Sequence, residues 1–436
     1  MTAATSTSPP RSARNTGLLG PALALTAALC LTPLAGCGAG AGGTAAGDWN
    51  LLFVTFDTTR ADALSCYGHE DAKTPTLDAL AAEGFLFEQA FATVPITLPS
   101  HSSLFTGTYP MAHGVRENGS FRLAESRTTL AEVLGGAGFA TGAAVGSFPL
   151  TRGFGIEQGF GFFDDNITAA RRNIEGKVTS DIDSLYFDER PSQHVNDAIL
   201  PFLEKQAGGR FFAWLHYWDP HQPLIPAPPF DQLFAHDLYQ GEIAQADQSL
   251  GQILAELERL GVLEKTLIVM AGDHGEGHGE HGEDSHSLLA YNSTLHVPLI
   301  VKIPGREGGV RIADRVSTID VMPTLLELLG LEAPPTMQGE SLLPLIESGR
   351  REGRERPIYA ETLSPRLSHG WGEQRAVFYG DQKYIHGPRS ELYNLRLDPR
   401  ELDDLAPQKP EDASEMKRLL EGLLKRYSVA DAADSV

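Results

Sequence analysis

The sequence predicts an α/β protein with a doubly wound, mixed but mostly parallel sheet and helices on both faces, followed by a small α+β subdomain. Short apolar runs without polar alternation, which are typical of buried parallel strands, take turns with segments of helical periodicity. Such an order of elements places helices on both faces of a sheet. The strands are expected at residues 51–56, 140–145, 211–217 and 266–271, and the helices at 76–83, 129–137, 194–205 and 241–260.

The composition is that of a large acidic chain. Its 436 residues are 42% hydrophobic, which suits one large domain with a smaller one attached. The formal net charge of −22 argues against a nucleic-acid partner, because binding to phosphate backbones needs clustered Lys and Arg.

The N-terminus has the order of a secretory signal. Arg11 and Arg14 precede an apolar run over 18–31, which is shorter than the ~20 residues of a membrane span. The sequence Leu-Ala-Gly-Cys at 34–37 resembles a bacterial lipobox, which implies cleavage before Cys37 and lipid attachment to its sulfur. The alternative is an ordinary signal peptide with a chance cysteine. We therefore expect an exported protein, anchored in the cell envelope on its periplasmic or cell-surface side.

Four segments are expected along the chain. They are the signal over 1–37, a flexible Gly- and Ala-rich linker over 38–47, the main α/β domain over 48–345 and a C-terminal subdomain over 346–436. The last boundary follows a change of texture, since a charged stretch gives way to short alternating runs and a final charged helix at 414–427.

Acidic residues follow three of the predicted strands closely. Asp57 comes after the first strand, Asp219 soon after the third, and Asp273 with His274 after the fourth. Ligands in open α/β sheets gather beyond the carboxyl ends of the strands, so these residues are expected in one neighbourhood. A carboxylate at that edge suits a metal ion, and a simple turn cap is the alternative.

The segment 97–107 predicts a helix whose start is suited to an anion. Pro99 fits a first helical turn, and Thr97 and Ser100 are common near an N-cap. Free N–H groups and a partial positive charge at such a helix start suit a phosphate or sulfate group. A well-capped structural helix is the alternative.

The segment 273–286 predicts a metal-binding loop. It holds four histidines and five carboxylates in fourteen residues, punctuated by glycines. A solvated polar loop would explain the glycines but not a histidine directly behind the acid that ends a strand. For His278 and His281, however, the solvated polar loop is the preferred interpretation.

Residues 49–345 resemble the sulfatase domain of the alkaline phosphatase superfamily. The resemblance rests on the order and spacing of short motifs that run from the first strand to the end of the main domain. These motifs are Asp57, Cys66-Tyr67-Gly68, Thr74 to Asp78, the helix from Thr97, Pro220 to Pro223, Asp273 to Glu276, and Val297-Pro298-Leu299, with Glu391 to Leu395 and Asp398-Pro399 beyond it. The resemblance implies an alkaline-phosphatase-like fold and an ester hydrolase.

The departures from sulfatases concern the site itself. Thr97 stands where sulfatases carry the Cys or Ser that becomes formylglycine, and threonine has no known route to that aldehyde. Thr58 replaces the second of two paired metal-binding acids, and His101 replaces an arginine. Ser147 and Pro149 stand where sulfatases carry Lys and His. Most of the residues that hold a sulfate group are therefore missing.

What remains resembles superfamily members that use an unmodified threonine. The resemblance implies a metal held by Asp57, Thr97, Asp273 and His274, with Thr97 as nucleophile and Asn118 steadying an equatorial oxygen. Metal coordination lowers the pKa of a hydroxyl nucleophile. The expected path is in-line attack by Thr97 on phosphorus, followed by hydrolysis of the phospho-threonine.

Further residues are nominated for the leaving group and the substrate. His221 and His286 are candidates to protonate the leaving oxygen, whereas Asp219, His221 and His286 together would be the ligands of a second metal. Substrate contacts are expected from His101 and Asp219. One metal per chain is preferred to two, and Zn²⁺ or Mn²⁺ suit the mixed ligands better than Ca²⁺.

Three functions are compared. The preferred one is hydrolysis of a phosphoric mono- or diester, the alternative is a sulfuric ester hydrolase without formylglycine, and the third is a surface-anchored binding protein that has lost catalysis. The substrate is expected to be a small or envelope-derived anionic ester. The long irregular segments 152–189 and 224–236 are expected to shape its site. They contain Arg171, Arg172, Lys177, Tyr186 and Phe230. The sequence does not predict an oligomeric state.

Overall fold

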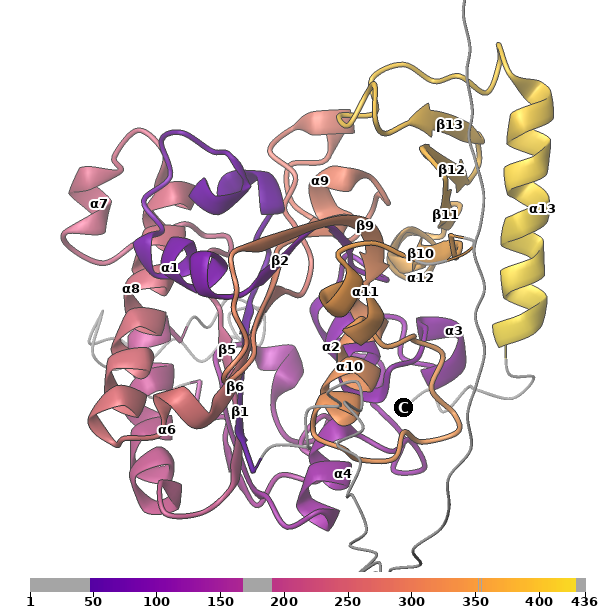
Figure 1. The fold of residues 1–436 in the computed structure, drawn as a ribbon. Helices are drawn as coiled ribbons and strands as arrows, with labels where there is room; N and C mark the ends of the chain where they lie inside the picture. The colour runs from indigo at the N-terminus through magenta and orange to yellow at the C-terminus, as the bar shows by residue number, and fades with distance from the viewer. Residues whose placement is uncertain (1–47, 168–189, 352, 354, 429–436) are drawn as a thin grey trace, which may run out of the picture. The chain divides into compact units, whose positions relative to one another are not determined.

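The computed structural model describes residues 48–167, 190–351, 353 and 355–428. Two sheets organise these residues (Figure 1). The larger has nine strands in the order β4-β3-β5-β1-β6-β8-β2-β7, with β9 paired to β2. Its strands are β1 (Asn50–Phe56), β2 (Phe85–Phe91), β3 (Ala140–Val145), β4 (Phe162–Asp164), β5 (Phe211–Tyr217), β6 (Thr266–Gly272), β7 (His296–Val297), β8 (Leu299–Lys302) and β9 (Val310–Ser317).

The large sheet is mixed, with a parallel part that carries the strands predicted from sequence. Strands β4, β3, β5, β1 and β6 run parallel to one another. Strand β8 is antiparallel to both β6 and β2, and β7 is antiparallel to β2. The predicted fold class of a mostly parallel α/β sheet is confirmed.

Strand β1 shows why both faces of the sheet are covered. Its side chains alternate, so Leu51 and Phe53 enter one buried cluster while Leu52 and Val54 enter another. The first cluster is closed by α2, α4 and α10, and the second by α1, α6 and α8, which lie on opposite sides of the sheet in Figure 1. The helices are α1 (Pro75–Glu83), α2 (Thr97–Thr106), α3 (Pro110–His113), α4 (Leu130–Gly136), α6 (Ser192–Gln206), α7 (Phe230–Leu233), α8 (Leu238–Arg259), α9 (Asn292–Leu295), α10 (Val321–Leu328), α11 (Leu343–Ser348), α12 (Ser364–His369) and α13 (Pro410–Tyr427).

The C-terminal part forms a four-stranded antiparallel sheet covered by α13 (Figure 1). Met416, Leu420 and Leu423 of α13 pack in one cluster with Val377 and Tyr384 of this sheet. The α+β character expected after residue 345 is therefore observed. The strands are β10 (Ile358–Thr362), β11 (Gln374–Tyr379), β12 (Gln382–His386) and β13 (Glu391–Asn394).

The strands that the sequence pattern missed lie mainly beyond β6 in the large sheet, where parallel and antiparallel pairs are mixed. Strand β2 places Glu88 and Gln89 in the middle of an apolar run, and β9 carries polar residues at half of its positions. Both lack the continuous apolar run by which the parallel strands were recognised. In β2, Glu88 and Gln89 are the two half-buried positions of a strand that is otherwise buried, whereas β9 is buried at only three of its eight positions.

Within the described residues, none of the helices combines the length and the apolar character needed to cross a membrane. Cys37 and the expected signal and linker lie outside the described residues.

Candidate metal centre and active site

The candidate site lies where strands β1 and β6 end. These strands are paired in parallel register, so Asp57 and Asp273, the residues that follow them, come side by side. The backbone N–H of Thr58 donates to Oδ1 of Asp273 over 3.2 Å. Thr58 has φ of 46°, in the left-handed region that a β-branched residue rarely adopts. This conformation of the turn after β1 lets the Thr58 N–H reach Asp273, so that Asp57 and Asp273 lie in the same buried site.

Asp57, Asp273 and His274 form a compact, fully buried cluster. One ligand atom of each lies within 4.8 Å of the others. Nε2 of His274 is 3.5 Å from Oδ1 of Asp57 and 3.6 Å from Oδ2 of Asp273. Nδ1 of His274 lies 3.0 Å from the carbonyl oxygen of Gly275, which only accepts hydrogen bonds, so the proton of the neutral ring is on Nδ1. The lone pair of Nε2 therefore faces the two acids.

The carboxylates of this cluster lack the hydrogen bonds that burial demands. Both oxygens of Asp57 and Oδ2 of Asp273 have no hydrogen-bond partner within the part of the chain that the structure describes. Burial raises the pKa of Asp57 to about 6 and raises the pKa of Asp273 well above its ordinary value, and the charge of Asp57 adds to the second shift. Burial lowers the pKa of His274. Two acids and a neutral imidazole with free lone pairs fit a divalent cation.

Thr97 is the first residue of α2 and faces this cluster. Its Oγ1 lies 3.4 Å from Nε2 of His274. The hydroxyl of Ser100 in the same turn donates to the backbone carbonyl of Asp273 over 2.6 Å, which fastens the start of α2 to the end of β6. The sequence placed Thr97 beside the metal ligands, and the structure brings the four residues together.

The helix start offers fewer free donors than the sequence led us to expect. The N–H of Leu98 donates to Oδ1 of Asn118 over 2.9 Å, and the N–H of Ser100 donates to the carbonyl of Ile96. Pro99 has no N–H. The expectation that this turn adds several backbone donors to a bound anion is therefore wrong. Asn118 reaches the start of α2, and the amide group of its side chain remains available to donate.

His101 is hydrogen-bonded to the backbone of Thr97. Its Nδ1 donates to the Thr97 carbonyl over 2.8 Å, and its Nε2 lies 3.0 Å from the hydroxyl of Thr55. Burial, with His216 nearby, lowers its pKa, so the ring is neutral. Both ring nitrogens are engaged inside the protein, which argues against the expected direct contact with substrate.

Asp219 is held by hydrogen bonds to residues outside the cluster. Its two carboxylate oxygens accept from the backbone N–H of Ser192 and the side-chain amide of Gln245, each over 2.7 Å. These bonds fix the chain after β5 to α6 and α8. Each oxygen already accepts one hydrogen bond, and Asp219 does not belong to the cluster of Asp57, Asp273 and His274, so its expected roles in a second metal site or in substrate binding are not supported.

His221 and His286 face each other beside His274. Their Nε2 atoms are 3.2 Å apart, and the ring centroids of His286 and His274 are 4.4 Å apart. Each Nδ1 lies near a backbone carbonyl, that of Gln222 for His221 and that of Pro95 for His286, so each neutral ring keeps its proton on Nδ1. Burial lowers the pKa of both to about 4. The Nε2 lone pairs of the two neutral rings therefore face each other, and they could bind a shared proton or a cation.

Two buried residues of the site received no role from the sequence. Nε2 of His216 in β5 lies 3.4 Å from Oδ2 of Asp57. Glu276 is fully buried, and burial raises its pKa to about 9 with a further contribution from Asp57. His216 could have been noticed as a histidine within the apolar run of β5. Glu276 could have been noticed because it lies in the turn that begins at Asp273.

The remaining loop histidines stay outside the cluster. The ring of His278 packs against Tyr239, and His281 stacks on Tyr291 with centroids 3.7 Å apart. This agrees with their expected assignment to a polar loop.

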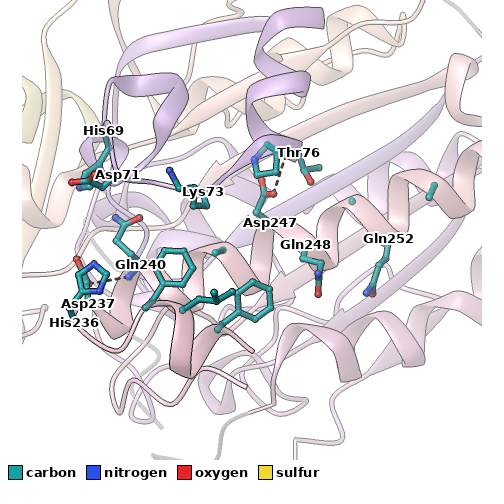
Figure 2. Close-up of a pocket in the computed structure, with 17 residues that line it drawn as sticks. His69, Asp71, Lys73, Thr76, His236, Asp237, Gln240, Asp247, Gln248 and Gln252 are labelled. Carbon is teal, nitrogen blue, oxygen red and sulfur yellow. Dashed lines mark hydrogen bonds between the residues drawn. The ribbon is translucent and has the colours of Figure 1, made fainter. Parts of the chain in front are cut away.

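The segment 224–236 lines a cavity away from the metal ligands. The cavity has a volume of about 1080 Å³ and lies between the loop before α1 and helices α7 and α8 (Figure 2). Phe230, Leu233, Phe234 and His236 contribute to its wall. Arg171, Arg172, Lys177 and Tyr186, which were nominated for substrate binding, lie outside the described residues.

Comparison with known proteins assigns the family. The family model described as "Sulfatase" matches residues 49–331, and the model described as "N-sulphoglucosamine sulphohydrolase, C-terminal" matches residues 279–428. The chain belongs to the sulfatase family. Its resemblance to sulfatases and its assignment to the ester hydrolases are thereby confirmed.

Individual relatives agree with this assignment. The chain is 28% identical over 339 residues to an ulvan-active sulfatase of Formosa agariphila, covering 69% of this chain and 65% of that protein. A phosphonate monoester hydrolase from Silicibacter pomeroyi has the same fold, with a TM-score of 0.73, 21% identity and coverage of 87% and 96%. A protein solved with its substrate D-glucosamine-2-N,6-O-disulfate gives a TM-score of 0.74 at 20% identity, with coverage of 88% and 99%.

Removal of divalent metal is expected to cost more stability at pH 8 than at pH 5. Without metal, the pKa of Asp57 is about 6 in the folded protein against an ordinary 3.8, so as the pH rises the unfolded chain loses this proton first and the fold is penalised. A bound cation replaces the proton, so its stabilising effect grows with pH. The measurement is the thermal unfolding midpoint with and without chelator at both pH values.

A matched pair of variants tests the origin of that effect. Asp57→Asn should reduce the difference between chelated and metal-loaded protein, whereas Asp62→Asn, at an acid whose side chain is 63% exposed, should retain it. An equal effect of the chelator at pH 5 and pH 8 would contradict the assignment of the buried acids as ligands.

Proposed function

We propose that this chain is a metal-dependent hydrolase of sulfuric esters, with Thr97 as its nucleophile. The observation that carries the proposal is the meeting of the Thr97 hydroxyl with the three buried ligands Asp57, Asp273 and His274. The reaction class is supported by the family and by relatives that are themselves sulfatases. Zn²⁺ or Mn²⁺ is favoured over Ca²⁺, because the ligands mix carboxylate, hydroxyl and imidazole.

The order of the candidate functions changes from the one that the sequence suggested. The residues alone favoured a phosphoester, whereas the family and the named relatives favour a sulfuric ester. Phosphoester hydrolysis remains the second candidate for one specific reason. The nucleophile position holds an unmodified hydroxyl, and an attacking alcohol or alkoxide suits phosphoryl transfer as well as sulfuryl transfer.

The proposed reaction has two steps at one side chain. Thr97 gives up its hydroxyl proton as Oγ1 forms a bond to sulfur and the bond from sulfur to the ester oxygen breaks. That proton passes to the ester oxygen, so that the alcohol leaves. Water then cleaves the sulfo-threonine and releases sulfate. A bound divalent cation would lower the pKa of the Thr97 hydroxyl and screen the negative charge of the ester.

Neighbouring side chains orient the Thr97 hydroxyl and are placed to contact the ester. His101 and Ser100 fix the first turn of α2, which sets the direction of the Thr97 hydroxyl. The side-chain amide of Asn118 is available to donate to an ester oxygen, because its carbonyl is already held by Leu98. His286 packs against His274 and faces His221, and this neutral pair is assigned to accept the Thr97 proton and return it to the leaving oxygen.

Thr97→Ala is expected to lower kcat/KM for 4-nitrophenyl sulfate by at least ~10³-fold, about 4 kcal/mol of transition-state stabilisation. Thr97→Ser keeps a hydroxyl and should retain activity within about tenfold. The measurement uses metal-loaded protein with 4-nitrophenyl sulfate, 4-nitrophenyl phosphate and bis(4-nitrophenyl) phosphate. Thr106→Ala removes a buried hydroxyl from the last turn of the same helix and serves as the control.

The outcomes separate the candidate functions. Cleavage of a phosphoester alone, lost in Thr97→Ala, would replace the sulfuric ester by the second candidate. Cleavage of any ester that survives Thr97→Ala would remove Thr97 as nucleophile. A metal-loaded protein that cleaves none of the three esters would favour the binding protein without catalysis.

The protein is further proposed to be exported and held at the cell envelope by a lipid on Cys37. The support is the basic, apolar and small-residue order of the segment before that cysteine. Mass spectrometry of the purified full-length protein should find residue 37 at the mature N-terminus with a lipid mass on it. The Cys37→Ser protein should appear in the soluble fraction. An unmodified Cys37 in the mature protein would contradict the anchor.

A further inference from the structure

The loop between β10 and β11 presents an aromatic ring to solvent. Trp371 is 62% exposed, while Trp214 and Trp218 are buried, and Leu367 on the neighbouring helix α12 is 44% exposed. Single exposed apolar side chains are common and need no special cause. Trp371 differs from such isolated side chains in the position of its loop, in the contacts of its ring and in the charges beside it.

The loop begins and ends at the rim of the candidate active site. Glu361 at the end of β10 forms an ion pair with Arg116, two residues before Asn118. The next residue, Thr362, donates its hydroxyl to the carbonyl of Ser287, which follows His286. The end of β10 thus lies between the Asn118 side and the His286 side of the site.

The return of the loop is fastened to the same segment. The side chain of Gln374, the first residue of β11, accepts from the backbone N–H of Ala290 over 2.9 Å. Residues 363–373 therefore leave the rim and come back to it within a few residues of His286.

Trp371 is held in place although it is exposed. Its backbone N–H donates to the carbonyl of Pro365 over 2.9 Å, and its ring stacks on His369 with centroids 4.7 Å apart and planes 27° apart. A rigid, amphipathic ring gives contact area with little loss of conformational entropy on binding. The hydrogen bond and the stack on His369, itself exposed, favour one orientation of the indole before a ligand arrives.

The charges beside Trp371 favour an anion. Glu373 pairs with two arginines, Arg366 over 2.7 Å and Arg375 over 2.5 Å. One acid thus meets two cations, which leaves a local positive charge on a chain whose formal net charge is −22. A bound anion needs such a local attraction, because the field of the whole chain repels it.

We propose that Trp371, with Arg366 and Arg375, forms a subsite for a sugar ring that neighbours the ester-bearing residue, so that the substrate is a sulfated oligosaccharide. The apolar C–H face of a pyranose stacks on the indole, and the arginines meet a sulfate or carboxylate of that ring. The proposal rests on the proposed hydrolysis at Thr97, and it adds the class of substrate and a second point of contact.

Binding to a catalytically silent protein tests the subsite without turnover. Metal-loaded full-length Thr97→Ala protein is titrated by calorimetry with size-defined sulfated tetrasaccharides from heparin, chondroitin sulfate and ulvan, and with the matching sulfated monosaccharides. Adding Trp371→Ala should weaken binding of the best tetrasaccharide at least tenfold. Trp371→Phe, which keeps a flat ring, should weaken it less than threefold.

The size of the sugar distinguishes a subsite from a structural role. Trp371→Ala should reduce the ratio of tetrasaccharide to monosaccharide affinity, because only the longer sugar reaches the ring. Leu397→Ala, at a side chain 75% exposed and outside this loop, is the control and should leave both affinities unchanged. An equal loss for both sugars would point to a structural effect and overturn the proposal, as would the absence of tetrasaccharide binding.

Failure of the subsite and failure of the proposed function give different results. Hydrolysis of 4-nitrophenyl sulfate through Thr97 with no Trp371-dependent binding of tetrasaccharide would refute the subsite alone. Binding of tetrasaccharide through Trp371 in a protein that cleaves no ester would keep the subsite and refute the hydrolase.

Discussion

The burial of two carboxylates beside each other is the constraint on which the rest of the site depends. Asp57 and Asp273 are fully enclosed, and three of their four oxygens have no hydrogen-bond partner among the described residues. The effective penalty for burying an ion in a protein is several kcal/mol, and two like charges add to it. Such an arrangement persists in a folded protein when a cation compensates it, which is why we regard the cluster as a metal centre.

The surrounding structure aligns the other parts with this pair. The parallel pairing of β1 and β6 brings the two acids to one edge of the sheet. The hydroxyl of Ser100 joins α2 to the end of β6, and His101 supports the turn that carries Thr97. The position of Thr97 thus follows from a few hydrogen bonds at the start of α2.

The sequence predicted the parts of the fold and site that depend on chain order. Buried parallel strands have a continuous apolar pattern, so Asp57, Asp273 and His274 were correctly expected at one edge of the sheet. Strands β2 and β9 were missed because polar residues interrupt their apolar runs. The order of residues along the chain does not predict which hydrogen-bond partners a side chain takes. Asp219 follows a strand as Asp57 does, yet its carboxylate turns to Ser192 and Gln245.

The central claim, one divalent metal held by Asp57, Asp273 and His274, is tested most directly by metal stoichiometry. The protein is stripped with a chelator, dialysed against Zn²⁺ or Mn²⁺ and analysed by elemental mass spectrometry. We predict one ion per chain, lost in Asp273→Asn and retained in Asp219→Asn. An unchanged ion content in Asp273→Asn, or a loss caused by Asp219→Asn alone, would contradict the assignment.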